Sequence, residues 1–290
     1  MFDNDLLRNY KHTLTRTGIL DLGNTKDFSY SHLERGVWKM YGKDKLYYTK
    51  AVNKCRMDAE VILSRAAKIA GLKTATYYAM QNPNFDDPNL TERDIIRLQN
   101  YQYVVSDNVV DENTMLASEF FKLVGGGDRA NTQMPYSFFN VNNLQDYTKY
   151  FTKEAMIDLL KMSIFDPFAF NFDRHEDNFA FQIQNGIVTG VVLFDYAAGG
   201  VGAKDRFINQ TYCSVLQPEE LNKTLTIEAV RDNPIASEII SNHELAEEMG
   251  RINFGEISKE CKEEMGYRTS PMYIDKLSRS FEECALILDK

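Results

Sequence analysis

The most informative residues of this chain are Asp173-Arg174-His175-Glu176-Asp177-Asn178, followed by Leu193-Phe194-Asp195-Tyr196. An Asp and an Asn five positions apart, then a second Asp after two strand-like segments, is the spacing that phosphoryl transfer requires. In that reaction one carboxylate orients the attacking hydroxyl, while a carboxamide and a second carboxylate hold Mg²⁺ against the phosphates of ATP. The pattern therefore predicts a kinase.

A predicted β-hairpin joins the two halves of this motif. Residues 179–183 and 188–194 are rich in β-branched and aromatic residues, and the pair Asn185-Gly186 between them is a strong signal for a two-residue turn. A polar loop followed by an ordinary hairpin is the alternative for these residues, since Asp, Asn and Gly are common in turns.

The register of this hairpin can be counted from the turn. If Gln184 faces Ile187, then Asn178 lies opposite Leu193. Because side chains alternate between the two faces of a strand, Asp195 is expected on the same face as Asn178. Diagonal neighbours on one face are close enough for their side-chain oxygens to converge on one cation.

At these residues the chain resembles the HipA-like serine/threonine kinases, and the phosphoinositide kinases share the Asp-Arg-His-x-x-Asn pattern. The apolar residues and Asn-x-Asp-Arg-His that open the family's motif are matched from Phe168 onward. The resemblance implies a catalytic role for Asp173, metal binding by Asn178 and Asp195, a place beside the nucleotide phosphates for His175, and a nucleotide-covering role for Phe194.

A second constellation lies nearer the N-terminus. Strands are predicted at residues 37–41 and 46–52, followed by a helix over residues 56–70 that ends at Gly71. Lys50 ends the second strand and Glu60 lies early in the helix, which is the arrangement that fixes a lysine on the α- and β-phosphates of ATP.

The alternative for this pair is a solvent-exposed lysine and a glutamate paired with a neighbour on its own helix. The segment from Tyr47 to Met80 also resembles the HipA-like family. One departure from nucleotide-binding kinases is plain, because no Gly-x-Gly-x-x-Gly loop precedes Lys50 and residues 28–36 would have to cover the phosphates with a single glycine.

Residues 104–109 resemble the strand-to-hinge segment of the family, where backbone groups hold the adenine. Ser106 and Asn108 are therefore nucleotide-binding candidates, with a plain strand leading into a turn as the alternative. Further strands are expected at residues 74–80 and 101–105.

The remaining pattern is helical. Thr152 is a plausible N-cap for a helix that supports the catalytic loop, and helices are expected at residues 236–249 and 274–289. We therefore expect an α+β, bilobal, protein-kinase-like fold with a small β-rich N-lobe over residues 1–106 and a larger, mostly helical C-lobe over residues 107–290.

Composition limits the partners. The net charge is −9, with 42 acidic against 33 basic residues, which argues against direct nucleic-acid binding over a large surface. No apolar run approaches the ~20 residues that cross a bilayer, so no membrane insertion is expected. The four cysteines are scattered without a Cys-x-x-Cys pair, and the N-terminus lacks an apolar signal region, so a cytoplasmic location is expected, with specialised export left open.

The function predicted from the sequence is ATP- and Mg²⁺-dependent transfer of the γ-phosphoryl group to Ser or Thr of a protein acceptor. A phosphoinositide-type lipid kinase is one alternative, although no Lys/Arg cluster stands out to face a membrane. A nucleotide-binding pseudokinase that acts as a partner-binding module is another. Transfer of AMP on a kinase-like scaffold is a third, because a scaffold does not determine its chemistry.

Overall fold

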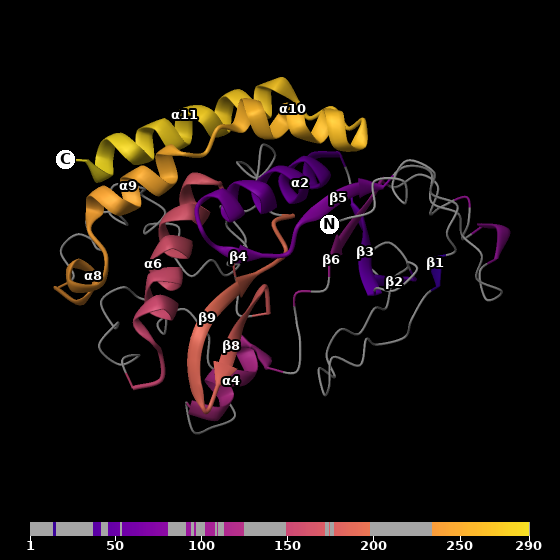
Figure 1. The fold of residues 1–290 in the computed structure, drawn as a ribbon. Helices are drawn as coiled ribbons and strands as arrows, with labels where there is room; N and C mark the ends of the chain where they lie inside the picture. Colours follow the sequence, from indigo (N-terminus) through magenta and orange to yellow (C-terminus); the bar gives the residue numbers. More distant parts are fainter. Residues whose placement is uncertain are drawn as a thin grey trace, which may run out of the picture.

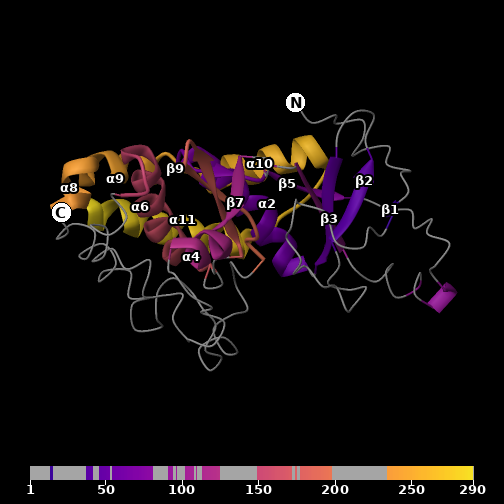
Figure 2. The same cartoon turned by 90° about the horizontal axis from the view of Figure 1, so that it is seen from below.

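The structure is a computed structural model, and it combines two small β-sheets with a set of helices (Figure 1). It describes residues 14–15, 37–41, 46–52, 54–80, 91–93, 96, 102–107, 109, 113–124, 149–171, 174, 177–197 and 234–289. Seen from below, the sheet that holds β2 and β3 lies at one end of the molecule and the helices α6, α8 and α9 lie at the other (Figure 2).

The first sheet has five strands in the order β1-β2-β3-β6-β5, all antiparallel to their neighbours. Its strands are β1 (Leu14–Thr15), β2 (Val37–Tyr41), β3 (Leu46–Val52), β5 (Tyr77–Met80) and β6 (Gln102–Asp107). The bounds predicted for β2 and β3 are confirmed. β6 lies between β3 and β5 and extends two residues beyond its predicted end, because Ser106 and Asp107 still pair with β3.

Helix α2 (Lys54–Ile69) follows β3 and packs on the first sheet through β5 and β6. Every residue from Met57 to Ala67 is buried, because the helix is covered on several sides. Gly71, with φ +76°, donates its N–H to the carbonyl of Lys68, and Leu72 donates to Ala67. This pair of hydrogen bonds is the Schellman motif, and the predicted role of Gly71 is confirmed.

The single strand predicted over residues 74–80 is wrong, because the chain passes from one sheet to the other within it. β4 (Lys73–Thr74) pairs in parallel with β9 of the second sheet, and the N–H of Ala75 also donates to Leu193 of that region. β5 then pairs with β6 of the first sheet. The residues that follow α2 in the chain thus connect the two sheets directly.

The second sheet has the order β4-β9-β8-β7 and contains the predicted hairpin. Its other strands are β7 (Thr114–Leu116), β8 (Phe179–Gln184) and β9 (Ile187–Leu193). Helix α4 (Ala117–Val124) follows β7 and packs against β8. Asn185 and Gly186 have φ values of +53° and +79°, the left-handed pair that a type I′ turn needs, and Gln184 faces Ile187 as predicted.

The register counted beyond this turn is wrong by one residue. Gln182 pairs with Gly190 while Ile183 pairs with Val188, so β9 carries one extra residue, a β-bulge. Phe179 therefore lies opposite Leu193, and Asn178 falls opposite Phe194. Gly190 stands beside the extra residue, and an isolated glycine within a strand pattern is a signal for a bulge. The bulge reverses the parity on which the expected shared face depended.

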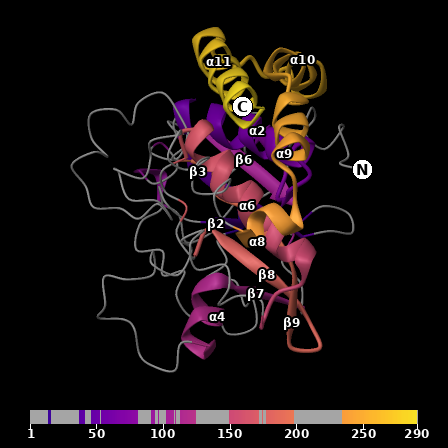
Figure 3. The ribbon, with the colours of Figure 1, turned by 90° about the vertical axis from the view of Figure 1, so that its left-hand side faces the viewer.

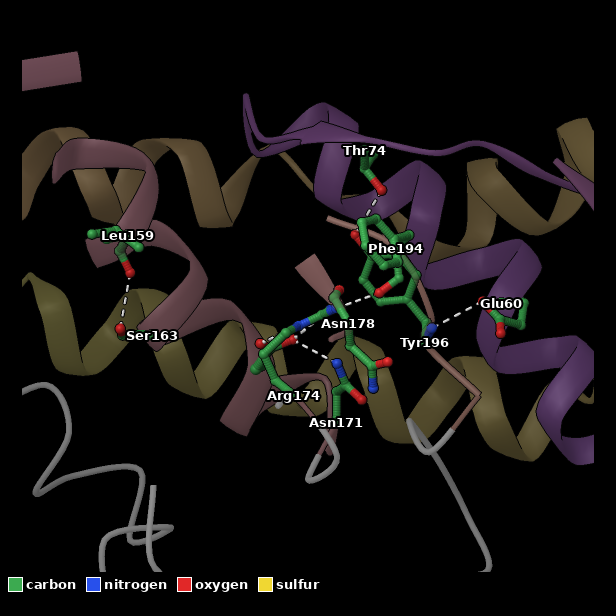
Figure 4. Close-up of polar contacts among 10 residues, drawn as sticks. Glu60, Thr74, Leu159, Ser163, Asn171, Arg174, Asn178, Phe194 and Tyr196 are labelled. Carbon is green, nitrogen blue, oxygen red and sulfur yellow. Dashed lines mark hydrogen bonds and ion pairs between the residues drawn. The ribbon is translucent and has the colours of Figure 1, made fainter. Parts of the chain in front are cut away.

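The helical part begins with α6 (Lys153–Phe168), which packs against β9. Thr152 caps it, since its side-chain oxygen accepts the N–H of Ala155 at 3.3 Å, as predicted. In the close-up, the Ser163 side chain of this helix bonds to the carbonyl of Leu159 (Figure 4). Buried aromatic rings, including Phe165 in α6, join this helix to the C-terminal helices.

The helix predicted over residues 236–249 is two helices, α8 (Pro234–Ile239) and α9 (Asn242–Gly250). Ser241 begins the second one with a full capping box: its side chain accepts the N–H of Glu244, and the Glu244 carboxylate accepts the N–H of Ser241.

Two further helices complete the chain. α10 (Phe254–Met265) lies within the stretch from Pro218 to Lys290 that was predicted to be helical, although its bounds were not predicted, and α11 (Pro271–Leu288) begins three residues earlier than expected. Both lie across the same side of the molecule as α2, with α9 beside α11 (Figures 1 and 3). Among the described residues, no helix has both the length and the apolar character needed to cross a membrane.

Candidate active site

Three elements bring charged side chains to one place. Lys50 comes from β3, Glu60 from α2, and Asp195 follows β9. Lys50 forms an ion pair with Glu60, and its Nζ lies 3.0 Å from Oδ1 of Asp195. The Glu60 side chain is fully buried, whereas those of Lys50 and Asp195 keep 18% and 40% of their surface exposed, so a ligand can reach both.

Glu60 also connects α2 to the chain after the hairpin. Its Oε2 accepts the backbone N–H of Tyr196 at 2.9 Å (Figure 4). The Tyr196 ring is buried, and its hydroxyl lies 2.7 Å from the Thr74 hydroxyl of β4. One carboxylate thus holds Lys50 with one oxygen and the residue after Asp195 with the other.

Burial and charge act in opposite directions on the carboxylates of this cluster. Burial raises the pKa of Glu60 to about 7, and the attraction of Lys50 only partly offsets it. Burial alone would also raise the pKa of Asp195, but the charge and hydrogen bond of Lys50 lower it to about 2. The pKa of Lys50 is raised despite burial, because Asp195 and Glu60 stabilise its charge.

Arg174, inside the sequence motif, is the centre of a second network. Its side chain is almost fully buried, and it forms two hydrogen bonds to the carboxylate of Asp166 in α6, at 2.9 and 3.2 Å. Its Nη1 donates to the carbonyl of Asn178 at 2.7 Å and also to the carbonyl of Phe194 (Figure 4). The guanidinium lies 4.9 Å from the centre of the Tyr196 ring.

One guanidinium therefore holds the beginning and the end of the hairpin. Phe194 donates its own N–H to the carbonyl of Asn178 at 3.3 Å, so Asn178 lies beside the residue that precedes Asp195. The two residues predicted to bind metal are thus brought to the adjoining ends of β8 and β9, although not by the register counted from the turn.

The donor chemistry here suits a hard cation such as Mg²⁺, which takes oxygen ligands. Asn171, almost fully buried, donates its Nδ2 to Asp166 at 2.8 Å; because a carboxylate only accepts, the amide oxygen must face away. That oxygen has no hydrogen-bond partner in the part of the chain that the structure describes. Like the side-chain oxygens of Asn178 and Asp195, it is a ligand of the type that Mg²⁺ takes, so the residue types fit the ion.

A metal site built from three or more His, Cys, Asp or Glu side chains does not occur among the described residues. The candidate site differs from such a cluster because two of its three side-chain donors are amides. The side chain of Asn171 is held by Asp166 and that of Asp195 by Lys50, whereas Asn178 is held by Arg174 through its backbone carbonyl.

The other predicted residues are placed as follows. Ser106 is buried within β6, opposite Tyr77 of β5, rather than in a hinge after the strand. Phe194 is half-buried and packs against the hydrophobic core. Asp173, His175 and Asn108 lie outside the described residues, as does the segment 28–36.

The sequence assigned no role to Arg174, Asp166 or Tyr77. Arg174 and Tyr77 contact predicted site residues, and Asp166 holds Arg174. The sequence contained a signal for Arg174. It lies between the predicted site residues Asp173 and Asn178, and an arginine that is buried requires charged or hydrogen-bonding partners. Asp166 is eight residues away on a helix, and only the packed fold shows that the two charges meet.

Comparison with solved structures identifies the fold. The Helicobacter pylori proinflammatory kinase CtkA is similar over 91% of this chain and 93% of that chain, with a TM-score of 0.50 and 11% sequence identity. The structure of HipA, HipB and operator DNA from the Shewanella oneidensis MR-1 toxin–antitoxin system matches 94% of this chain and 67% of that chain, with a TM-score of 0.42 and 9% identity.

WaaP in complex with acyl carrier protein matches 88% of this chain and 87% of that chain, with a TM-score of 0.33 and 13% identity. No protein-family model matches the sequence, and no curated protein matches it. The similarity to CtkA confirms the predicted α+β, kinase-like fold, with a small β-rich part and a larger helical part. The division at residues 106 and 107 stays a prediction.

Proposed function

We propose that this protein is a kinase that uses ATP and Mg²⁺ to phosphorylate Ser or Thr of a protein. One observation carries the proposal: Lys50, Glu60 and Asp195, from three elements and both sheets, meet in one charged cluster within a kinase-like fold. A fully buried glutamate that orients a partly exposed lysine is the arrangement that positions the α- and β-phosphates of a nucleotide.

The remaining roles follow from the motif. Asp173 orients the acceptor hydroxyl, and Asn178 and Asp195 hold the metal ion. When bound, Mg²⁺ supplies positive charge that offsets the charge on the phosphates. We assign His175 a place beside the phosphates, and Asn108 and Phe194 a contact with the nucleotide; Ser106, buried between β3 and β5, is left out of this assignment. Because phosphoryl transfer depends mainly on positioning and electrostatics, the rigid anchoring of Lys50 and Asp195 supports this assignment.

Incubation with γ-labelled ATP, Mg²⁺ and a panel of Ser- and Thr-containing proteins tests the proposal. Asp173→Ala is expected to lower turnover by about 10²- to 10⁴-fold while ATP still binds, since it removes a group that acts in the reaction itself. Lys50→Met is expected to weaken ATP binding as well. The matched control is Lys259→Met, an exposed lysine whose ion-pair partner, Glu256, lies on the same helix, α10.

Mass spectrometry of the product identifies the transferred group, and phosphoinositide vesicles serve as the lipid acceptor. A phosphate on Ser or Thr of a protein supports the proposal. Transfer to the lipid alone, an AMP adduct, or ATP binding without any transfer would each contradict it. Unchanged phosphoryl transfer by Asp173→Ala would refute the assignment of the site.

A further inference from the structure

Tyr77, in β5, has a buried side chain that reaches the charged cluster. Its hydroxyl oxygen accepts the backbone N–H of Asp195 at 3.2 Å, and Nζ of Lys50 lies 5.3 Å from the centre of its ring. Tyr77 therefore contacts two of the three residues on which the proposed function rests. The sequence pattern gave it no role beyond that of a strand residue.

The backbone of Tyr77 is fixed from two directions. Its N–H donates to the Ser64 hydroxyl at 3.2 Å, and its carbonyl accepts Nη1 of Arg65 at 2.6 Å. Both partners lie on α2, one turn beyond Glu60. On its other side the strand pairs Tyr77 with Ser106 of β6. Because these contacts leave the backbone little freedom, the hydroxyl has a defined position relative to α2 and the first sheet.

Asp195 needs such support because its backbone is strained. Its φ is +57°, in the left-handed region, which costs a residue with a side chain of the order of 1 kcal/mol or more. Two hydrogen bonds favour this conformation: the N–H of Asp195 donates to Tyr77, and Oδ1 of Asp195 accepts the N–H of Ala197 at 3.2 Å. In this conformation the carboxylate reaches Lys50.

We propose that Tyr77 is a positioning residue for the metal–nucleotide site, holding Asp195 through its backbone N–H so that the carboxylate points to the cation and to Lys50. This deepens the proposed function and rests on it. A tyrosine hydroxyl is ordinarily neutral at pH 7. A neutral phenol can accept the N–H without placing a further negative charge beside Asp195.

Tyr77→Phe tests this role, because it removes one oxygen and keeps the ring beside Lys50. Titration calorimetry measures the binding of two probes: Mn²⁺ together with a non-hydrolysable ATP analogue, and the analogue alone. Loss of one hydrogen bond is expected to weaken metal binding about 5- to 15-fold and leave binding of the analogue alone unchanged. In turnover assays, the Mg²⁺ concentration required for half-maximal rate is expected to rise similarly, with a smaller change in kcat.

Tyr78→Phe is the matched control. Tyr78 is the next residue of the same strand, is equally buried, and lies with its ring centre 4.9 Å from the guanidinium of Arg65. The same chemical change there is expected to leave metal binding unchanged. Equal metal affinities of Tyr77→Phe and the wild type would overturn the inference and leave the proposed function standing, whereas a wild type that binds no metal–nucleotide would overturn both.

Hydrogen exchange of the Asp195 amide in the unaltered protein is a second measurement, which does not depend on the folding of any variant. The amide lies in a short segment after β9, where the Asp195 side chain is partly exposed. If Tyr77 holds it, the amide is protected against exchange. Exchange at the rate of an unstructured peptide would overturn the inference.

Discussion

Arg174→Met is the most informative single substitution in this chain, because it removes one buried charge and keeps much of the side-chain volume. Arg174 is 1% exposed and donates to the Asp166 carboxylate and to the carbonyls of Asn178 and Phe194. The variant therefore leaves a buried carboxylate without its cation, and two backbone carbonyls lose a donor.

The expected cost is large. Removing one partner of a buried ion pair costs about 3–5 kcal/mol, much of it the penalty of the unpaired charge that remains. For a chain of this size each kcal/mol lowers the melting temperature by roughly 2 °C, so a fall of roughly 6–10 °C is expected. Arg174→Met with Asp166→Leu removes both charges and is expected to recover about half of the loss, because the carbonyls still lack a donor.

Urea unfolding of the wild type, both single variants and the double variant gives the coupling energy between the two side chains. The control is Lys259→Met, which breaks an exposed 3.9 Å ion pair with Glu256 and is expected to change stability by less than about 0.5 kcal/mol. Two results would contradict this reasoning: a loss of unfolding free energy in Arg174→Met no larger than in the control, or a loss in the double variant equal to the sum of the two single losses. Either would show that the buried network does not hold the hairpin.

Two more predictions concern the same fold. Because burial raises the pKa of Glu60 to about 7, the ionised fraction of Glu60 increases between pH 6 and pH 8, and kcat/KM is expected to rise about tenfold over this range. Glu60→Gln is expected to lower the rate and to remove this rise from the pH profile. If the rise were unchanged in the variant, another group would be responsible for it. Ser241→Ala removes the N-cap of α9 and is expected to cost about 1 kcal/mol in urea unfolding, whereas exposed Ser237→Ala in α8 serves as the comparison and should cost less.

Local signals in the sequence were sufficient for several elements. The strands around Lys50, the Gly71 end of α2, the type I′ turn at Asn185-Gly186 and the Thr152 cap were all predicted, because each depends on residues within a few positions of one another. The ion pair of Lys50 and Glu60 was also predicted. Only ten residues separate the two side chains, so a strand followed directly by a helix can place them in few relative positions.

Other features depended on contacts between distant segments. The residues at 73–80 have the composition of one strand, but pairing with β9 and then with β6 divides them into two. The break between α8 and α9 depends on a capping box at Ser241 that competes with a continuous helical pattern. The bulge in β9 arises beside Gly190; an isolated glycine in a strand favours a bulge, but only the pairing with β8 shows that the register changes there.

The order of the residues specifies which chemical groups are available: a lysine and a glutamate on adjacent elements, then an amide and a carboxylate at the two ends of a hairpin. How those ends meet depends on the packing of the whole fold. A one-residue bulge moved Asn178 opposite Phe194, and the buried Arg174 and Tyr77 set the backbone that orients Asp195. The physical reason is that spacing along a chain constrains neighbours, whereas buried hydrogen bonds between distant segments form only when those segments pack together.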